Sequence, residues 1–182
     1  MLTFESIPPY WHLALDRVQR YNKSAVISGG AIRDLDLGRP VKDIDIFVSA
    51  EAAMKSIKGV IGDMSTAWTE NPEYADGTAR AILASSTSNP VDKSQLPINI
   101  TKLGKGSNPR ERWREHDFGL CQIMFDGHKF ESTEYYEHDK ENQTLTLTHC
   151  DSYYAWYRSF KRYHRLFQKY PWPMETKLVR TN

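Results

Sequence analysis

The chain has 182 residues, of which 40% are hydrophobic, and its 24 lysines and arginines nearly balance its 23 aspartates and glutamates. This length predicts one compact domain, and the near-neutral charge excludes a whole-protein basic binder of the histone type, so any nucleic-acid surface must be a local patch. Two cysteines, Cys121 and Cys150, are too few for a disulfide scaffold and favour a reducing, cytoplasmic compartment. No run approaches the roughly 20 apolar residues of a membrane span, and no membrane partner is expected.

The first part of the chain predicts a helix, a strand, a tight turn and a second helix. After Pro8 and Pro9, apolar residues recur at helical spacing. Residues 24–28 read SAVIS, a β-prone run that stops at Gly29 and Gly30 before the helix-compatible AIRDLDL. The apolar positions of the first helix are Trp11, Ala14, Leu15, Val18 and Tyr21.

A second strand follows. Pro40 disfavours helical geometry in the residue before it and ends the second helix, and KDIDIFV (42–48) then alternates polar with apolar residues as a strand does. Ser49 is predicted to cap a helix in AEAAMKSI (50–57).

The later elements are predicted from shorter patterns. Two strands are expected at 78–85 and 96–103, joined by the Ser/Asn/Pro-rich loop 85–95. HDFGLCQIMF (116–125) predicts another strand, which the turn pair Asp126-Gly127 closes. Beyond it we expect a helix-like segment at 132–139, a strand at 143–149 and a final helix at about 152–170.

Two features of the first half are expected to meet in space. Because side chains alternate across a strand, Asp43 and Asp45 point to one face, where two carboxylates can share a hard cation. The interval between Gly30 and Asp43 is enough for one helix and a return, which places the glycine turn beside the carboxylates. Glycine N–H groups at a helix start can face a phosphate directly, and Ser28 can add a hydroxyl donor. Each feature alone is more often structural, since Gly-Gly is common in turns and Asp-x-Asp on solvated strand faces.

The order of these features is more specific than either one. The string SGGAIRDLDLGRPVKDIDIFV (28–48) resembles the signature of class II tRNA CCA-adding enzymes and bacterial poly(A) polymerases, within the nucleotidyltransferase superfamily of DNA polymerase β. The resemblance covers residues 24–49, and EHDFGLCQIMFDG (115–127) is more weakly similar to a family segment of type R-R-D-F-T-I-N. It implies an α+β, polymerase β-like nucleotidyltransferase fold, with a small mixed β-sheet flanked by helices.

The resemblance also implies a chemistry. Asp43 and Asp45 would hold Mg²⁺ (or Mn²⁺) for a two-metal transfer from a nucleoside triphosphate (NTP), with pyrophosphate as the leaving group. The superfamily usually adds a third carboxylate from a neighbouring strand. Asp117 is our first candidate for it, although the similar aspartate of CCA-adding enzymes lies near the ribose and base, and the alternative position holds Asn99.

The nucleotide would contact Ser28, Gly29, Gly30 and Arg33, according to the same resemblance. Arg33 is expected near phosphate, but an internal pair with Asp34 that merely orients the helix is an equal alternative. A basic stretch, KLGKGSNPRERWR (102–114), is expected as a mobile loop that could close on an incoming phosphate.

The final helix is predicted to be amphipathic. Its aromatic residues recur in steps of four and three, so we expect them to pack on the core and the cations to occupy the outer surface. The cations could contact RNA or another phosphate, or could simply solvate the outer face. The aromatic residues are Trp156, Phe160, Tyr163, Phe167 and Tyr170, and the cations are Arg158, Lys161, Arg162, Arg165 and Lys169.

The leading hypothesis is therefore a nucleotidyltransferase that moves NMP from an NTP to an acceptor hydroxyl, with RNA or tRNA favoured as the acceptor. The chain has no room for the neck, body and tail domains that hold tRNA in CCA-adding enzymes, so residues 1–182 are expected to form a single minimal catalytic head. Two alternatives stay open: a non-catalytic nucleotide- or RNA-binding module, and a toxin- or resistance-type transferase that modifies a protein or a small molecule. The sequence predicts no particular oligomeric state.

Overall fold

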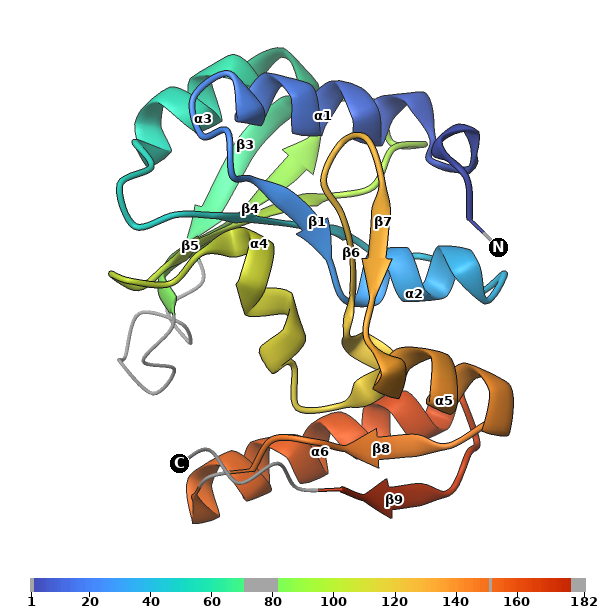
Figure 1. Ribbon diagram of the computed structural model, residues 1–182. Helices are drawn as coiled ribbons and strands as arrows, with labels where there is room; N and C mark the ends of the chain where they lie inside the picture. The colour runs from blue at the N-terminus through green and yellow to red at the C-terminus, as the bar shows by residue number, and fades with distance from the viewer. Residues whose placement is uncertain (1, 71–81, 151, 178–182) are drawn as a thin grey trace.

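The computed structural model describes residues 2–70, 82–150 and 152–177 (Figure 1). Among these residues, the main sheet has seven strands in the order β3-β4-β5-β2-β1-β6-β7. Strands β2 and β5 are parallel, whereas the other neighbours are antiparallel, so the sheet is mixed as predicted. The strands are β1 (Val26–Ser28), β2 (Ile44–Val48), β3 (Ser65–Glu70), β4 (Ile82–Pro90), β5 (Ile98–Leu103), β6 (Ile123–Phe125) and β7 (Phe130–Ser132).

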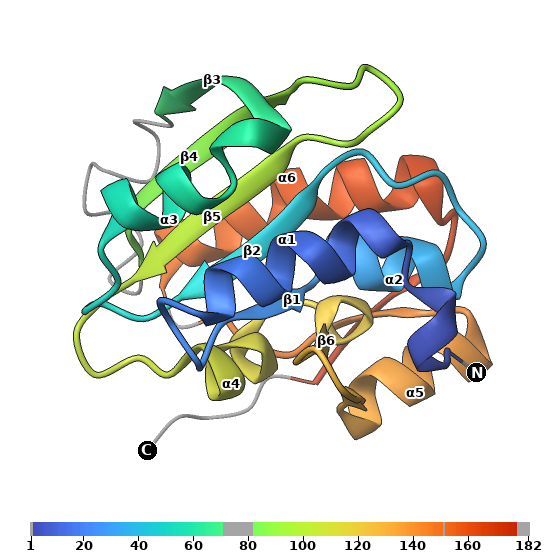
Figure 2. The same ribbon diagram turned by 90° about the horizontal axis from the view of Figure 1, so that it is seen from above.

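Helices lie on both sides of the sheet. Figures 1 and 2 show α1 and α3 together on one side and α6 on the other. A second, two-stranded sheet pairs β8 (Leu145–Leu147) with β9 (Met174–Thr176) in parallel, and α6 connects them. None of the described helices is long and apolar enough to cross a membrane. The helices are α1 (Pro9–Gln19), α2 (Gly30–Asp36), α3 (Met54–Val60), α4 (Pro109–Arg112), α5 (Glu134–Asn142) and α6 (Tyr153–Lys169).

The predicted succession of helix, strand, turn, helix and strand in the first 48 residues is confirmed. In β2, Ile44, Ile46 and Val48 are fully buried, because alternate side chains of the strand face the core. In α1, the four apolar residues Trp11, Ala14, Leu15 and Val18 are buried as expected. Tyr21 was predicted to join them, but it is 55% exposed because α1 ends at Gln19.

Two local predictions are wrong, and one strand was not anticipated. Ser49 does not cap α3, which begins at Met54, and instead exchanges hydrogen bonds with Asn22. The loop predicted at 85–95 is strand as far as Pro90, because buried hydroxyl groups there find partners: the Ser88 Oγ, for example, accepts a bond of 2.7 Å from the backbone N–H of Ile98. Strand β3 was not anticipated, and residues 78–81 of the predicted strand lie outside the described residues.

The strand predicted at 116–125 is mostly not a strand. Only β6 pairs in the sheet, and Gly119–Cys121 forms a turn of 3₁₀ helix before it. An added Cβ on Gly119 would lie 2.8 Å from the Cβ of Tyr135 and 3.0 Å from its carbonyl oxygen. This close approach of α5 replaces the extended backbone that the apolar run alone favoured. The helix, the strand and the final helix that follow are confirmed as α5, β8 and α6.

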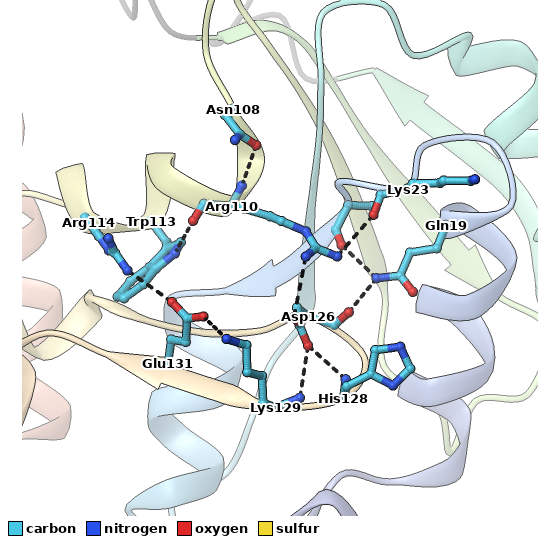
Figure 3. Close-up of polar contacts among 11 residues, drawn as sticks. Gln19, Lys23, Asn108, Arg110, Trp113, Arg114, Asp126, His128, Lys129 and Glu131 are labelled. Carbon is cyan, nitrogen blue, oxygen red and sulfur yellow. Dashed lines mark hydrogen bonds and ion pairs between the residues drawn. The ribbon is translucent and has the colours of Figure 1, made fainter.

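The turn at Asp126 ties three elements together (Figure 3). Its Oδ1 accepts the N–H groups of His128 and Lys129, each at 2.9 Å, so the predicted turn ends β6 here and leads into β7, a strand that was not predicted. The Gln19 amide of α1 donates to the Asp126 carbonyl at 2.7 Å, and the Arg110 guanidinium of α4 lies 3.7 Å from its carboxylate (Figure 3). The segment predicted as a mobile loop at 102–114 is therefore partly helical and anchored.

Helix α6 packs with only part of the face that was predicted: Tyr163 and Tyr170 lie against the core as expected, but the other three aromatic residues do not. Trp156, Phe160 and Phe167 are 46%, 42% and 42% exposed, whereas Ser159 and Leu166 are buried. The cations Arg162 and Lys169 face the body of the protein, where each forms an ion pair with an aspartate side chain that is largely shielded from solvent. Buried carboxylates require donors, and these two long side chains supply them.

We predict that Tyr170→Phe lowers the free energy of unfolding by about 1.5–3 kcal/mol, as expected for a hydrogen bond to a charged group. The Tyr170 hydroxyl donates to the buried Asp34 carboxylate at 2.6 Å, and the ring is only 1% exposed. Urea unfolding measures the effect. Tyr153→Phe is the control, because Tyr153 is 83% exposed. Equal stability of the two variants would contradict a stabilising role for this bond.

Candidate functional site

The parallel pairing of β2 with β5 brings two carboxylates and one amide together. Asp45 lies opposite Asn99 in the register. The Asn99 Nδ2 donates to Asp43 Oδ2 and to Asp45 Oδ1, both at 3.0 Å, while the Thr87 hydroxyl donates to Asn99 Oδ1 at 2.6 Å. Of the two candidate positions for a third ligand, the one beside the aspartate pair is thus held by Asn99.

The group formed by Asp43, Asp45 and Asn99 lacks a positive charge to balance its two carboxylates. Burial and the neighbouring Asp43 carboxylate raise the pKa of Asp45 to about 6, although the Asn99 amide and the charges of Arg162 and Arg33 oppose the rise. A divalent cation would relieve the repulsion, and carboxylate and amide oxygens are ligands that Mg²⁺ accepts. Across the described ranges no three His, Cys, Asp or Glu side chains form a metal cluster. The donors that fit a cation are the two carboxylates, because the Asn99 amide presents its N–H₂ group to them and its oxygen to Thr87.

The glycine turn lies next to this group. The register of β1 with β2 sets Ile27 opposite Ile46, and its continuation sets Ser28 opposite Asp45. Gly29 has φ +79°, in the region that favours glycine, and an added Cβ would lie 3.3 Å from His116 Nε2. The Ser28 hydroxyl donates to the Ile123 carbonyl at 3.0 Å and is 3.3 Å from the same imidazole nitrogen. Gly30 begins α2.

His116 is kept neutral. Burial, together with the charges of Arg112 and Arg162, lowers its pKa to about 3 against the opposing effect of Asp117. The imidazole therefore stands beside Gly29 as a neutral hydrogen-bonding group at neutral pH. The sequence drew attention to His116 only through its neighbour Asp117. No local pattern indicates that the imidazole lies against the glycine turn.

Arg33 lies in an internal network. It is 7% exposed, its guanidinium donates to Asp34 at 2.7 Å and to the Cys121 Sγ at 3.2 Å, and it lies 5.2 Å from the centre of the Tyr170 ring. Asp34 also pairs with Lys169 of α6. This geometry is that of the internal Arg–Asp pair, the second of the two alternatives for Arg33.

Asp117 serves the docking of α6. The Ser159 hydroxyl donates to its Oδ2 at 2.7 Å, and Arg162 pairs with its Oδ1. Burial raises the pKa of Asp117, but these partners outweigh burial and the net shift is downward, so the carboxylate stays ionised. The residue that hydrogen-bonds to Asp43 and Asp45 is Asn99.

Arg112 is a further cation near His116 and Asp117. Among the described residues, its Nε and Nη1 are buried without a hydrogen-bond partner, and Glu115 approaches the Nε only to 3.5 Å. Burial lowers its pKa. A half-buried guanidinium with free donors is suited to an anion, and the sequence placed Arg112 only within a basic stretch.

The five predicted cations of α6 separate into two groups. Arg162 and Lys169 are engaged inward, and Lys169 also donates to the Pro40 carbonyl at 2.7 Å. Arg158 is half-buried and lies over the Tyr154 ring, Lys161 is exposed and lies over Tyr157, and Arg165 is exposed. Only this second group can meet a partner directly.

Residues 6–146 match the family model described as "Gad2: Gabija anti-defense 2 family protein". The chain belongs to the Gad2 family. No curated protein matches the sequence.

Solved structures show what fold this Gad2 family member has. A CCA-adding enzyme with ATP superposes with a TM-score of 0.69 at 16% identity, over 94% of this chain and 41% of that one. The Thermotoga maritima CCA-adding enzyme complexed with tRNA gives 0.66 at 17% identity, over 94% and 40%. The Bacillus stearothermophilus enzyme with CTP gives 0.61 at 15%, over 93% and 42%. The predicted nucleotidyltransferase fold is confirmed, and the chain spans less than half the length of these enzymes.

We predict that Asp45→Asn, in EDTA, becomes more stable relative to the natural protein as the pH rises from 4 to 7. The folded pKa of Asp45, about 6, lies above the value of about 3.9 for an unfolded aspartate. The folded state therefore binds more protons between these values, and stability falls as pH rises through this window by an amount on the order of 1–3 kcal/mol. The Asn99 amide can hydrogen-bond to an aspartate or to an asparagine at position 45.

Urea unfolding at pH 4 and pH 7 measures the effect. A difference in stability between the two proteins that is the same at both pH values would contradict the raised pKa. Addition of Mg²⁺ at pH 7 should stabilise the natural protein and leave Asp45→Asn much less affected, because only the former keeps both carboxylates.

Proposed function

We propose that this chain is a minimal nucleotidyltransferase domain that transfers NMP from an NTP to an acceptor hydroxyl, with Asp43 and Asp45 as ligands of Mg²⁺ or Mn²⁺. The observation that carries the proposal is the close grouping of both carboxylates with Asn99, one strand away from the Ser28-Gly29 turn. Two acidic side chains with a raised pKa at Asp45, set beside a glycine turn on a nucleotidyltransferase fold, support metal-assisted phosphoryl transfer better than a structural role.

The reaction exchanges one phosphorus–oxygen bond for another. The acceptor oxygen loses its proton and bonds to the α-phosphorus, while the bond from that phosphorus to the bridging oxygen breaks and pyrophosphate leaves. The bound cation would supply charge neutralisation and acidify the acceptor hydroxyl. Asp43 and Asp45 would hold it, and the phosphates would lie along the Ser28-Gly29 turn, where the His116 imidazole occupies the space that a Gly29 side chain would need.

Other residues contribute to binding. The neutral His116 can hydrogen-bond beside the turn without adding charge, and the unpartnered Arg112 nitrogens offer donors to an anion. In this proposal Arg33 acts indirectly, because its guanidinium is committed to Asp34 and connects α2 to Cys121 and the Tyr170 ring.

A second candidate function follows from Asn99. A neutral amide in place of a third carboxylate weakens the binding of the cation that activates the acceptor. The chain could therefore bind Mg²⁺ and NTP without turnover and act as a non-catalytic module. The family description names an anti-defense role against Gabija. Either a transfer onto RNA, protein or a small molecule, or sequestration of a nucleotide, could serve such a role, and the acceptor class decides between them.

The paired substitution Asp43→Asn with Asp45→Asn should abolish Mg²⁺-dependent transfer and weaken Mg²⁺-dependent NTP binding at least tenfold, with the fold retained. Label from each α-labelled NTP is followed into RNA, protein and small-molecule acceptors offered separately. Asp16→Asn is the matched control, because this side chain is 61% exposed on α1. A double variant that binds and transfers like the natural protein would refute the site.

The substitution Asn99→Asp should tighten Mg²⁺ binding and raise the transfer rate about tenfold or more, because it adds a third charged ligand beside the first two. Without Mg²⁺ the same change should destabilise the protein through repulsion among three carboxylates. Asn142→Asp, on the exposed surface of α5, controls for the added charge. If the natural protein binds NTP without transfer and Asn99→Asp gains activity, the non-catalytic reading holds for the natural chain.

A further inference from the structure

The outer face of α6 carries a row of exposed aromatic rings, which we call the aromatic stripe: Tyr153, Trp156, Phe160 and Phe167. Their exposed fractions run from 42% to 83%. Spacings of three, four and seven residues place all four on one side of the helix. Large apolar side chains concentrated in this way on one exposed face indicate a binding surface rather than core.

The rings are already arranged as a stack. The Tyr153 and Trp156 rings are inclined by 24° with centres 6.2 Å apart, and the Trp156 and Phe160 rings by 13° with centres 5.3 Å apart. From Tyr153 to Phe160 the helix rises about 10 Å, which is the length of about three stacked nucleotides. A row of flat aromatic rings, unlike interdigitating aliphatic side chains, can stack against planar bases.

Cations border the stripe on one side. Lys161 lies over the Tyr157 ring at 4.5 Å and Arg158 over the Tyr154 ring at 6.0 Å, so each charge stands beside an exposed aromatic side chain. Residues 153–169 contain no aspartate or glutamate. A second copy of the same surface would bring like charges together, whereas a partner with regular negative charge and planar rings is complementary to it.

The helix that carries the stripe also contacts the candidate site. On its opposite side, Ser159 and Arg162 bind Asp117 beside His116.

We propose that the aromatic stripe binds single-stranded nucleic acid, with bases stacked on Trp156 and Phe160 and phosphates against Arg158 and Lys161. That this strand is the acceptor of nucleotidyl transfer rests on the proposed function above, whereas the binding itself does not. Aromatic stacking tolerates any base, so the surface selects unpaired strands rather than a sequence.

Fluorescence anisotropy tests the binding with a labelled 12-nucleotide RNA and its DNA counterpart, in low salt with EDTA and without NTP. Trp156→Ala with Phe160→Ala should raise the Kd at least about tenfold. Arg158→Gln with Lys161→Gln should raise it too, and should reduce the dependence of log Kd on log salt by about 0.7 for each phosphate that is no longer neutralised. Tyr21→Ala, a 55% exposed aromatic outside α6, should leave the Kd unchanged.

Three results would overturn the inference. They are absence of oligonucleotide binding by the natural protein, unchanged binding by both stripe variants, and a dimer in sedimentation that Trp156→Ala dissociates, since the stripe would then join two copies. Asp16→Asn, on α1 and outside both the aspartate pair and the stripe, should keep full oligonucleotide binding. Binding without transfer would thus refute only the proposed function, and transfer onto protein or a small molecule without oligonucleotide binding would refute only this inference.

Discussion

The candidate site depends on the parallel pairing of β2 with β5. Both strands are buried through Ile44, Ile46 and Ile98, so their register is fixed by the core, and a slip of one residue would turn the polar side chains inward. This pairing sets Asp45 against Asn99 and brings Asp43 to the same amide. The cost of holding two carboxylates together, visible in the raised pKa of Asp45, is sustained by the hydrophobic packing on the other face of the sheet.

The site was predictable where it is local in the sequence. Alternation in β2 and the strand–glycine–helix order placed Asp43, Asp45 and Gly29 on neighbouring elements, and the structure agrees. Asn99 and His116 come from segments 54 and 87 residues further along the chain than Asp45 and Gly29, and no local pattern specifies which of several polar residues arrives there. For that reason the sequence left two alternatives for the third metal ligand, Asp117 and Asn99.

The extent of helix α6 was predicted, but only Tyr163 and Tyr170 of its five predicted core aromatic residues pack inward. Periodicity shows that a helix has two unlike faces, and the usual preference buries the aromatic one. Here the buried carboxylates of Asp34 and Asp117 lie where the helix docks, and they are paired with Lys169 and Arg162. The energetic demand of buried charge overrides apolar burial, a demand that only the assembled fold reveals. The second half of β4 was predicted as loop for a similar reason, because its hydroxyl groups find partners across the sheet.

Helix α6 is the connection of a β–α–β unit. Strand β8 precedes it and β9 follows it, and the two pair in parallel with Leu145 opposite Met174. Both ends of the helix are therefore fastened to the same small sheet, while its middle is held by Asp117. Such a helix cannot roll about its axis without breaking strand pairing, so the side that meets the rest of the protein and the side that meets solvent are set by topology as well as by charge. Whatever binds on the outside is held at a constant angle to the aspartates within.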